Sequence, residues 1–113
     1  MKLTHRDFDD IRVISVDEAR IDAACAIQFK DQMREKTDDA PSRVVLDLGR
    51  VAFLDSSGLG AVVAAMKAMK DGHRLELAAL NPPVQRVFHL TRMDNVFRIH
   101  PSIDTVVPGD DET

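Results

Sequence analysis

Alternating apolar and polar positions divide the first third of the chain into two strands and a helix. Residues 2–8 and 11–16 are typical of β-strands, and the polar pair Asp9-Asp10 joins them in a short turn. Residues 37–42, which include two Asp and one Pro, are predicted to be a loop. Residues 23–36 are predicted to form a helix whose apolar stripe recurs every four positions, at Ile21, Cys25, Phe29 and Met33.

The same kind of pattern continues through the rest of the chain. It predicts strands at residues 44–48 and 75–80, and helices at residues 59–70 and 81–88. Asn81 is expected to cap the third helix, whose first turn holds two Pro residues. Strands that alternate with helices predict a single α/β domain (an α+β sandwich) over residues 1–107. We expect a mixed sheet of four to five strands with about four helices mainly on one face, and a flexible acidic tail at residues 108–113.

Composition and charge narrow the classes of function. The chain has 113 residues, of which 44% are hydrophobic and 30% charged, as in one globular domain. Its net charge is −4, its basic residues are scattered, and it has no Trp or Tyr, which argues against nucleic-acid binding. No apolar run approaches the roughly 20 residues that span a bilayer, and the N-terminus lacks a signal-peptide core. We therefore expect no membrane insertion and a cytoplasmic location.

Catalytic and metal chemistry have little support in the sequence. Cys25 is the single cysteine, so an internal disulfide and a cysteine metal cluster are excluded, and a small buried residue is the expected role. The four His residues fall on four different elements, and no pair has metal-ligand spacing. Ser56 lacks the Gly-x-Ser-x-Gly setting of a hydrolase nucleophile. We expect neither an enzyme nor a bound cofactor or metal.

The junction before the second predicted helix carries the candidate chemistry. Asp55, Ser56, Ser57 and Gly58 stand where the first backbone N–H groups of a helix have no partner inside the helix. One interpretation is structural, with the hydroxyl of Ser56 or Ser57 as the helix cap. The other is functional, because a hydroxyl at the positive end of a helix, beside a glycine that lets another chain approach, is suited to phosphorylation.

The junction belongs to a longer ordered string: a β-run, the apolar pair Phe53-Leu54, the sequence Asp-Ser-Ser-Gly-Leu-Gly from Asp55, and an apolar helix. This string resembles the signature of the STAS domains, and in particular that of the bacterial anti-sigma-factor antagonists. The resemblance implies phosphorylation of Ser56, the hydroxyl directly after the Asp, with Ser57 as the next candidate. It also matches Asp22 to a family Asp that usually follows Gly-Glu-Leu, although Ala-Arg-Ile precedes it here. The resemblance further implies that residues 96–99 form the last strand and residues 103–107 the closing helix.

The predicted helix at residues 59–70 has two apolar sides. The side expected to pack on the sheet holds Leu59, Val62, Val63, Met66 and Met69, and the far side holds Ala61, Ala64, Ala65 and Ala68. The alanines are explained either by their high helix propensity or by a flat docking strip for a partner. The residues predicted to contact a partner are Asp22, Asp55, Ser57, Gly58, Leu59, Gly60, Ala61 and Ala64.

The resemblance implies a regulatory role exerted through another protein. The unphosphorylated domain would bind an anti-sigma factor that is also a serine kinase, and would thereby free the sigma factor. A phosphoryl group on Ser56 adds a charge of about −1.5 to −2 and would release the domain. ATP would belong to the kinase, and a serine phosphatase is a further partner to consider. Two alternatives use the same fold: a STAS subunit of a lipid-transport ABC ATPase, and a subunit of a larger signalling assembly.

Overall fold

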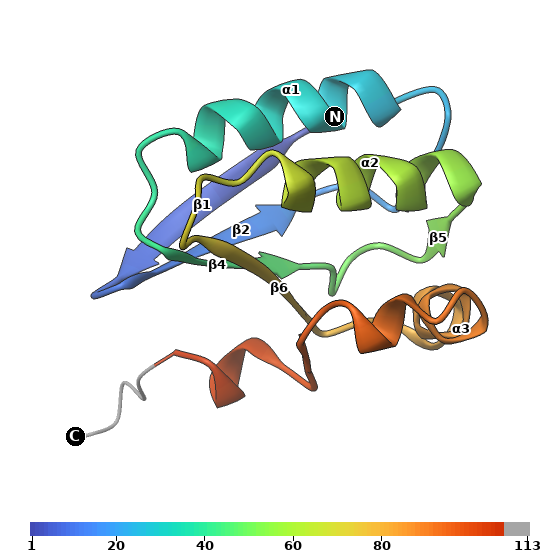
Figure 1. Cartoon of the computed structure of the whole chain (residues 1–113). Coiled ribbons are helices and arrows are strands. Elements are labelled where there is room, and N and C mark those ends of the chain that lie inside the picture. The colour runs from blue at the N-terminus through green and yellow to red at the C-terminus, as the bar shows by residue number, and fades with distance from the viewer. Residues whose placement is uncertain (108–113) are drawn as a thin grey trace.

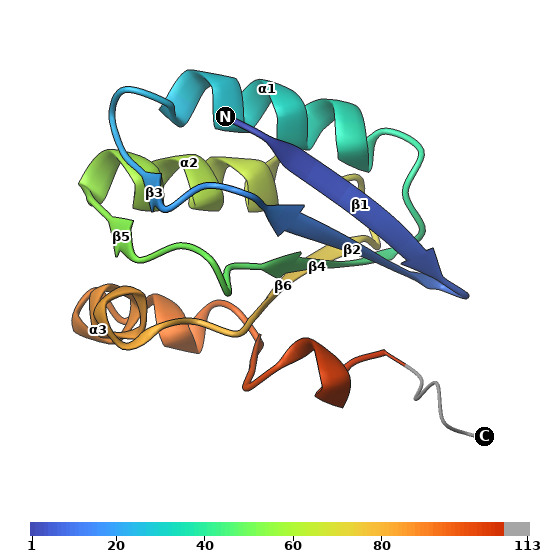
Figure 2. The same cartoon turned by 180° about the vertical axis from the view of Figure 1, so that it is seen from behind.

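The computed structural model describes residues 1–107 of the chain, so the predicted tail at residues 108–113 lies outside the described part. Its centre is a five-stranded sheet in the order β1-β2-β4-β6-β7. Strands β1, β2, β4 and β6 of this sheet are labelled in Figure 1 and Figure 2. Strands β1 and β2 are antiparallel, and all other neighbours are parallel. The strands are β1 (Leu3–Phe8), β2 (Ile11–Val16), β4 (Arg43–Asp47), β6 (Arg74–Ala78) and β7 (Ile99–His100).

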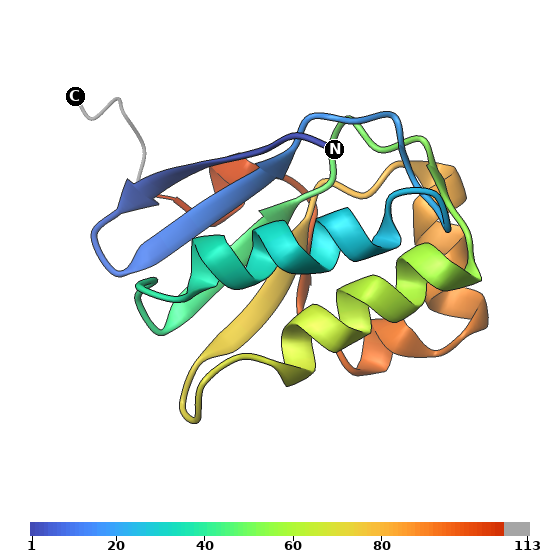
Figure 3. The same cartoon turned by 90° about the horizontal axis from the view of Figure 1, so that it is seen from above.

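Two helices cover one face of this sheet. Helices α1 (Ala26–Thr37) and α2 (Ser56–Lys67) lie side by side above the strands (Figure 1, Figure 3). A small parallel sheet, formed by β3 (Arg20–Ile21) and β5 (Phe53–Leu54), lies at the end where both helices begin. Helix α3 (Pro82–Leu90) packs against β5.

Short 3-10 turns complete the described part of the chain. They are η1 (Met93–Asn95) and η2 (Ile103–Thr105), and the segment with η2 lies on the face of the sheet opposite α1 and α2 (Figure 1). The predicted fold class and mixed sheet are therefore confirmed. The described residues contain three α-helices rather than about four, because the predicted closing helix is a single 3-10 turn.

The strands bury side chains on both faces. Alternate residues, such as Val44 and Leu46 of β4, enter the main core under α1 and α2. The intervening Val45 joins a smaller cluster on the outer face, together with Val13 and Ala78. Apolar residues of the last turn pack over this smaller cluster: Ile103, Val106 and Val107. Cover on both faces explains why the central strands are nearly continuous apolar runs.

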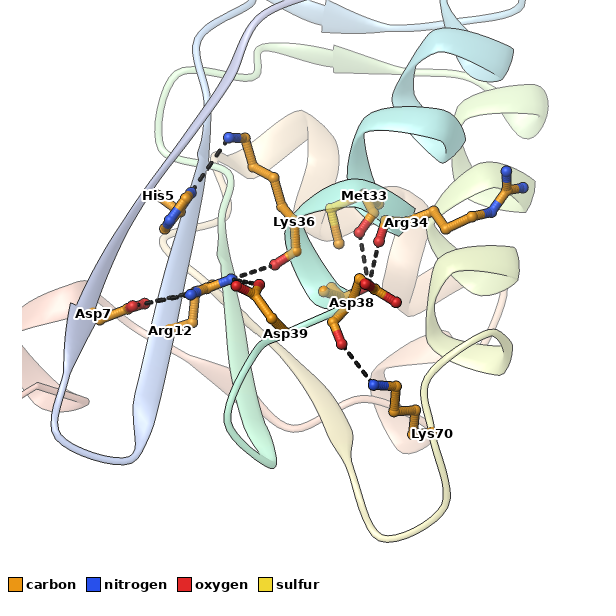
Figure 4. Close-up of polar contacts among 10 residues, drawn as sticks. His5, Asp7, Arg12, Met33, Arg34, Lys36, Asp38, Asp39 and Lys70 are labelled. Carbon is orange, nitrogen blue, oxygen red and sulfur yellow. Dashed lines mark hydrogen bonds and ion pairs between the residues drawn. The ribbon is translucent and has the colours of Figure 1, made fainter.

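A buried cation ties together the end of the domain where α1 finishes (Figure 4). The guanidinium of Arg12 in β2 donates to both carboxylate oxygens of Asp7, at 2.7 and 3.0 Å. It also donates to the carbonyl of Lys36 and to Asp39, each at 2.8 Å. The side chain of Arg12 is only 8% exposed, and each of its three nitrogens donates a hydrogen bond. This charge therefore fixes the hairpin β1–β2 to the C-terminal end of α1.

Several element boundaries differ from the sequence-based prediction. Helix α1 begins at Ala26 rather than at residue 23, because Ile21 belongs to β3 and residues 23–25 form a turn. Helix α2 begins three residues earlier than predicted, at Ser56, and ends at Lys67. The last strand, β7, covers Ile99–His100 instead of residues 96–99.

Candidate functional site

Two short strands bring Asp22 and Asp55 to the same edge of the molecule. Strands β3 and β5 are parallel, and Ile21 is paired with Leu54, so the next residue of each strand leaves at the same level. The N–H of Asp55 donates to the Ile21 carbonyl at 3.4 Å, and the N–H of Ala23 donates to Asp55 Oδ2 at 3.3 Å. The loop after β3 is thereby fixed to the start of α2.

Asp55 is the cap of helix α2. Its Oδ1 accepts a hydrogen bond from the N–H of Gly58 at 2.8 Å, and its backbone is extended, as expected for a capping residue. The prediction that Ser56 or Ser57 caps the helix is therefore wrong. Both carboxylate oxygens of Asp55 accept from backbone N–H groups, one in α2 and one in the loop after β3.

Ser56 and Ser57 form the first turn of α2, and both are exposed. Among residues 1–107, neither hydroxyl makes a hydrogen bond to another group. Unpaired N–H groups and the helix dipole make this position electropositive, which favours an anion there. The geometry thus presents two accessible hydroxyls at a helix start, while the adjacent carboxylate is occupied with capping.

Asp22 is held as a carboxylate beside this turn. Its Oδ2 accepts from Arg20 Nε at 2.8 Å, and its Oδ1 accepts from the N–H of Ala24 at 3.1 Å and from the thiol of Cys25 at 3.5 Å. Burial acts to raise the pKa of Asp22, but these hydrogen bonds outweigh it and lower the pKa below its usual value. The Arg20 guanidinium also lies over the ring of Phe53, 4.8 Å from its centre.

Two residues predicted to contact a partner are instead buried inside the domain. Gly58 lies against the backbone of β3, where a side chain would overlap the Ile21 carbonyl. Ala61 is 3% exposed in the main core. The expectation that these two residues bind a partner is therefore corrected: their small size lets α2 pack closely on its neighbours.

Two of the four alanines in the strip on α2, Ala61 and Ala65, are likewise internal, whereas Ala68 is exposed. Ala65 is buried, and α2 lies alongside α1 over much of its length (Figure 3). Ala64 is half-buried in a shallow hollow with Lys30 and Arg34 of α1. The residues of the predicted set that remain at the surface are Asp22, Asp55, Ser57, Leu59, Gly60 and, at the margin, Ala64.

The structure adds large apolar side chains that the sequence analysis did not select. Phe53 is 44% exposed and lies three residues before Ser56, and Ile27 is 70% exposed in the first turn of α1. Helices α1 and α2 begin at the same end of the domain (Figure 3). Exposed apolar residues beside a polar site are typical of a protein–protein interface. The signal available in the sequence was the position of Ile27, which breaks the polar face of an otherwise charged helix.

The His side chains contact groups away from the Ser56 turn. His5 lies 3.3 Å from Lys36 Nζ, His89 lies 3.0 Å from Asp94, and His100 lies 2.7 Å from Glu76. Within residues 1–107, no three His, Cys, Asp or Glu side chains are grouped so that they could hold a metal ion. In the same residues, every helix is too short or too polar to cross a membrane.

Comparison with known proteins identifies the family. The model of the STAS domain family matches residues 3–106, which is nearly the whole chain. The chain therefore belongs to the STAS domain family.

Several similar proteins are named as anti-sigma factor antagonists. BtrV of Bordetella bronchiseptica, provisionally named an anti-sigma factor antagonist, is 31% identical over 100 residues, which cover 88% of this chain and 85% of BtrV. The anti-sigma-F factor antagonist RsfB of Mycobacterium tuberculosis is 26% identical over 95% of this chain and 87% of its own. The crystal structure of an anti-sigma factor antagonist from Mycobacterium paratuberculosis has a TM-score of 0.82 and 29% identity, covering 92% of this chain and 88% of the other.

Proposed function

We propose that this protein is an anti-sigma factor antagonist that is switched by phosphorylation of Ser56. Relatives that match most of this chain, and are matched over most of their own length, are named as anti-sigma factor antagonists. The single structural observation that carries the proposal is the Ser56 turn. The hydroxyl of Ser56 is exposed, makes no hydrogen bond within residues 1–107 and stands at the start of a helix. The backbone around it is fixed by the hydrogen bonds that Asp55 accepts from the N–H groups of Gly58 and Ala23.

The proposed docking surface surrounds this turn. Its polar part is Asp22, Asp55 and Ser57, and its flat part is Leu59, Gly60 and the margin at Ala64. Phe53 and Ile27 add exposed apolar area at the same end. Interfaces of this kind combine a few large apolar anchors with a polar rim, so these two side chains are the expected anchors of an anti-sigma factor.

Charge explains why phosphorylation would end the complex. A phosphoryl group adds a charge of about −1.5 to −2 beside the carboxylates of Asp22 and Asp55. The start of the helix returns only about 0.3–1 kcal/mol for an exposed anion, so the fold gains little from the modification. A partner surface that fits a neutral hydroxyl would have to desolvate a dianion, and that cost falls on the complex.

The partner supplies the rest of the reaction in this proposal. The anti-sigma factor acts as the serine kinase and binds the ATP, and a serine phosphatase restores the unmodified hydroxyl. Transfer of the γ-phosphoryl group to the Ser56 oxygen releases ADP and the hydroxyl proton. This scheme places the protein in the bacterial cytoplasm, where sigma factors act.

The experiment compares Ser56→Ala, Ser56→Asp and Ser57→Ala. Calorimetry with the cognate anti-sigma factor should show binding by Ser56→Ala and Ser57→Ala, and loss of binding by Ser56→Asp. Intact-mass measurement after incubation with that kinase and ATP should show one added phosphate on Ser57→Ala and none on Ser56→Ala. A phosphate on Ser56→Ala would overturn the site. Stable association with an ABC ATPase, unaffected by Ser56→Asp, would favour the transporter alternative.

A further inference from the structure

The first part of strand β6 has no paired strand on the side that faces β7. Strand β6 pairs with β4 over all five residues from Arg74 to Ala78, but it pairs with β7 only at Leu77 and Ala78. The N–H of Leu77 donates to the carbonyl of Arg98 on the β7 side. Peptide groups two residues apart in a strand point the same way, so the N–H and C=O of Leu75 face the open side. These two groups belong to a residue that is 4% exposed, and they are the unpaired part of this edge that another strand could extend.

A hollow of about 250 Å³ follows this free edge. Its apolar wall comes from Met66 of α2, Leu75 of β6, and Val96, which is 51% exposed. Alternate residues of an added strand would meet this wall, as in known complexes in which a peptide extends a sheet.

The polar side of the hollow is positively charged, although the whole chain carries a net charge of −4. Arg74 is 65% exposed at its side chain, Arg98 is exposed, and His73 is half-buried. The acid that also lines the hollow, Glu76, presents almost no charge to solvent, because its side chain is 2% exposed.

Three side chains contact the Glu76 carboxylate. Arg43 Nη2 lies 2.9 Å from its Oε1, Arg74 Nε lies 2.9 Å from its Oε2, and His100 Nε2 lies 2.7 Å from its Oε1. Burial acts to raise the pKa of Glu76, but the hydrogen bonds from Arg43 and His100 outweigh it and lower the pKa. The exposed Arg74 and Arg98 can therefore pair with carboxylates of a ligand, while the carboxylate of Glu76 is shielded from solvent.

We propose that the free edge of β6 binds an extended acidic segment of a partner protein, which adds to the sheet as a further strand. Its backbone pairs with Leu75, its apolar residues contact Met66 and Val96, and its carboxylates pair with Arg74 and Arg98. The edge begins where α2 ends, at the far end of the domain from Ser56 (Figure 1). A partner bound at the Ser56 turn therefore leaves this edge accessible, and the inference does not depend on the proposed function.

A labelled peptide of alternating Val with Asp or Glu tests the proposal by fluorescence anisotropy. We expect saturable binding, no binding of the same peptide with Lys at every acidic position, and at least about tenfold weaker binding to Arg98→Glu. Arg6→Glu is the matched control, because Arg6 is an exposed arginine on β1, the opposite edge of the same sheet. Equal weakening by Arg98→Glu and Arg6→Glu would show nonspecific charge attraction and would overturn the proposal.

Amide exchange locates the peptide. Binding should slow exchange of the Leu75 N–H and leave the amides of the Ser56 turn unchanged. Protection at the Ser56 turn without protection at Leu75 would place the peptide elsewhere and refute the proposal. Sedimentation of the free protein supplies the third outcome: self-association that protects Leu75 without peptide would assign the edge to a second copy of this chain instead.

Discussion

Gly58 of α2 lies against the backbone carbonyl of Ile21 in β3, so closely that a β-carbon at position 58 would stand 2.8 Å from the carbonyl carbon. This contact joins the two segments that carry the candidate site, the loop with Asp22 and the turn with Ser56. A glycine is needed here for close approach, not for a special backbone angle, because residue 58 lies inside a helix.

Replacement of this glycine should therefore damage both stability and the site. Gly58→Ala is expected to cost about 2–3 kcal/mol of unfolding free energy, because α2 or β3 must move to admit the methyl group. Gly60→Ala is the matched control: nothing lies within 4 Å of the added carbon, and alanine in a helix should gain about 0.5–1 kcal/mol. Urea unfolding measures both, and equal stability of the two variants would contradict this account.

The capping role of Asp55 gives a second prediction. Asp55→Ala should lose about 1 kcal/mol, because the N–H groups of Gly58 and Ala23 lose their acceptor. Asp55→Asn keeps an oxygen that can accept from Gly58 and should retain most of the stability. Thermal unfolding of the native protein and both variants at one pH tests this. If Asp55→Asn proves as unstable as Asp55→Ala, the charge of the carboxylate rather than its capping bond is what stabilises the helix.

The sequence pattern predicted the longer elements well, because their periodicity is set by burial. Strand β2 falls at the predicted residues 11–16, and the run around Val45 is a central strand covered on both faces. Strands of two residues such as β3 have too few positions to show any period. The four-residue spacing from Ile21 to Cys25 therefore read as helix, although Ile21 pairs with Leu54 in a strand.

The candidate site was only partly predictable for a related physical reason. The order Asp-Ser-Ser-Gly indicates a helix start, but which oxygen caps the helix depends on backbone angles, and Asp55 takes that role. A strip of alanines at helical spacing fits a partner surface and a close neighbouring helix equally well. Tertiary packing decides between them, and it buries Ala61 and Ala65.

Asn81 provides a third prediction, because its role differs from the expected one. Its side chain makes no capping bond in α3; instead Nδ2 donates to the carbonyls of Gly49 and Val51, at 3.0 and 2.9 Å. Asn81→Ala should cost about 1–2 kcal/mol, since the carbonyl of the buried Val51 loses its donor.

Asn81→Asp separates the two roles of this side chain. Aspartate is a good helix cap but has no N–H to donate. We expect it to be as destabilised as Asn81→Ala in urea unfolding at neutral pH. Native stability of Asn81→Asp would restore the capping interpretation.

The last prediction concerns acid stability and the Arg12 cluster. The hydrogen bonds from Arg12 lower the pKa of Asp7 and that of Asp39 below the usual value of 3.8. Folded-state pKa values below the unfolded values mean that this contribution to stability is complete at pH values above 3.8. It is lost as the pH falls through the lower folded pKa values, where both carboxylates take up protons.

Arg12→Met should remove that contribution at all pH values. At pH 7 we expect a loss of about 2 kcal/mol, because the exposed carboxylates regain water while the Lys36 carbonyl loses a donor. The difference in unfolding free energy between Arg12→Met and the native protein should shrink below pH 3.8.

Arg34→Met is the control for this experiment. It removes an exposed arginine 3.8 Å from Asp31 and should change the unfolding free energy little. Unfolding curves between pH 2 and 7 test this, and a difference that stays constant throughout that range would show that Arg12 stabilises the fold by packing alone.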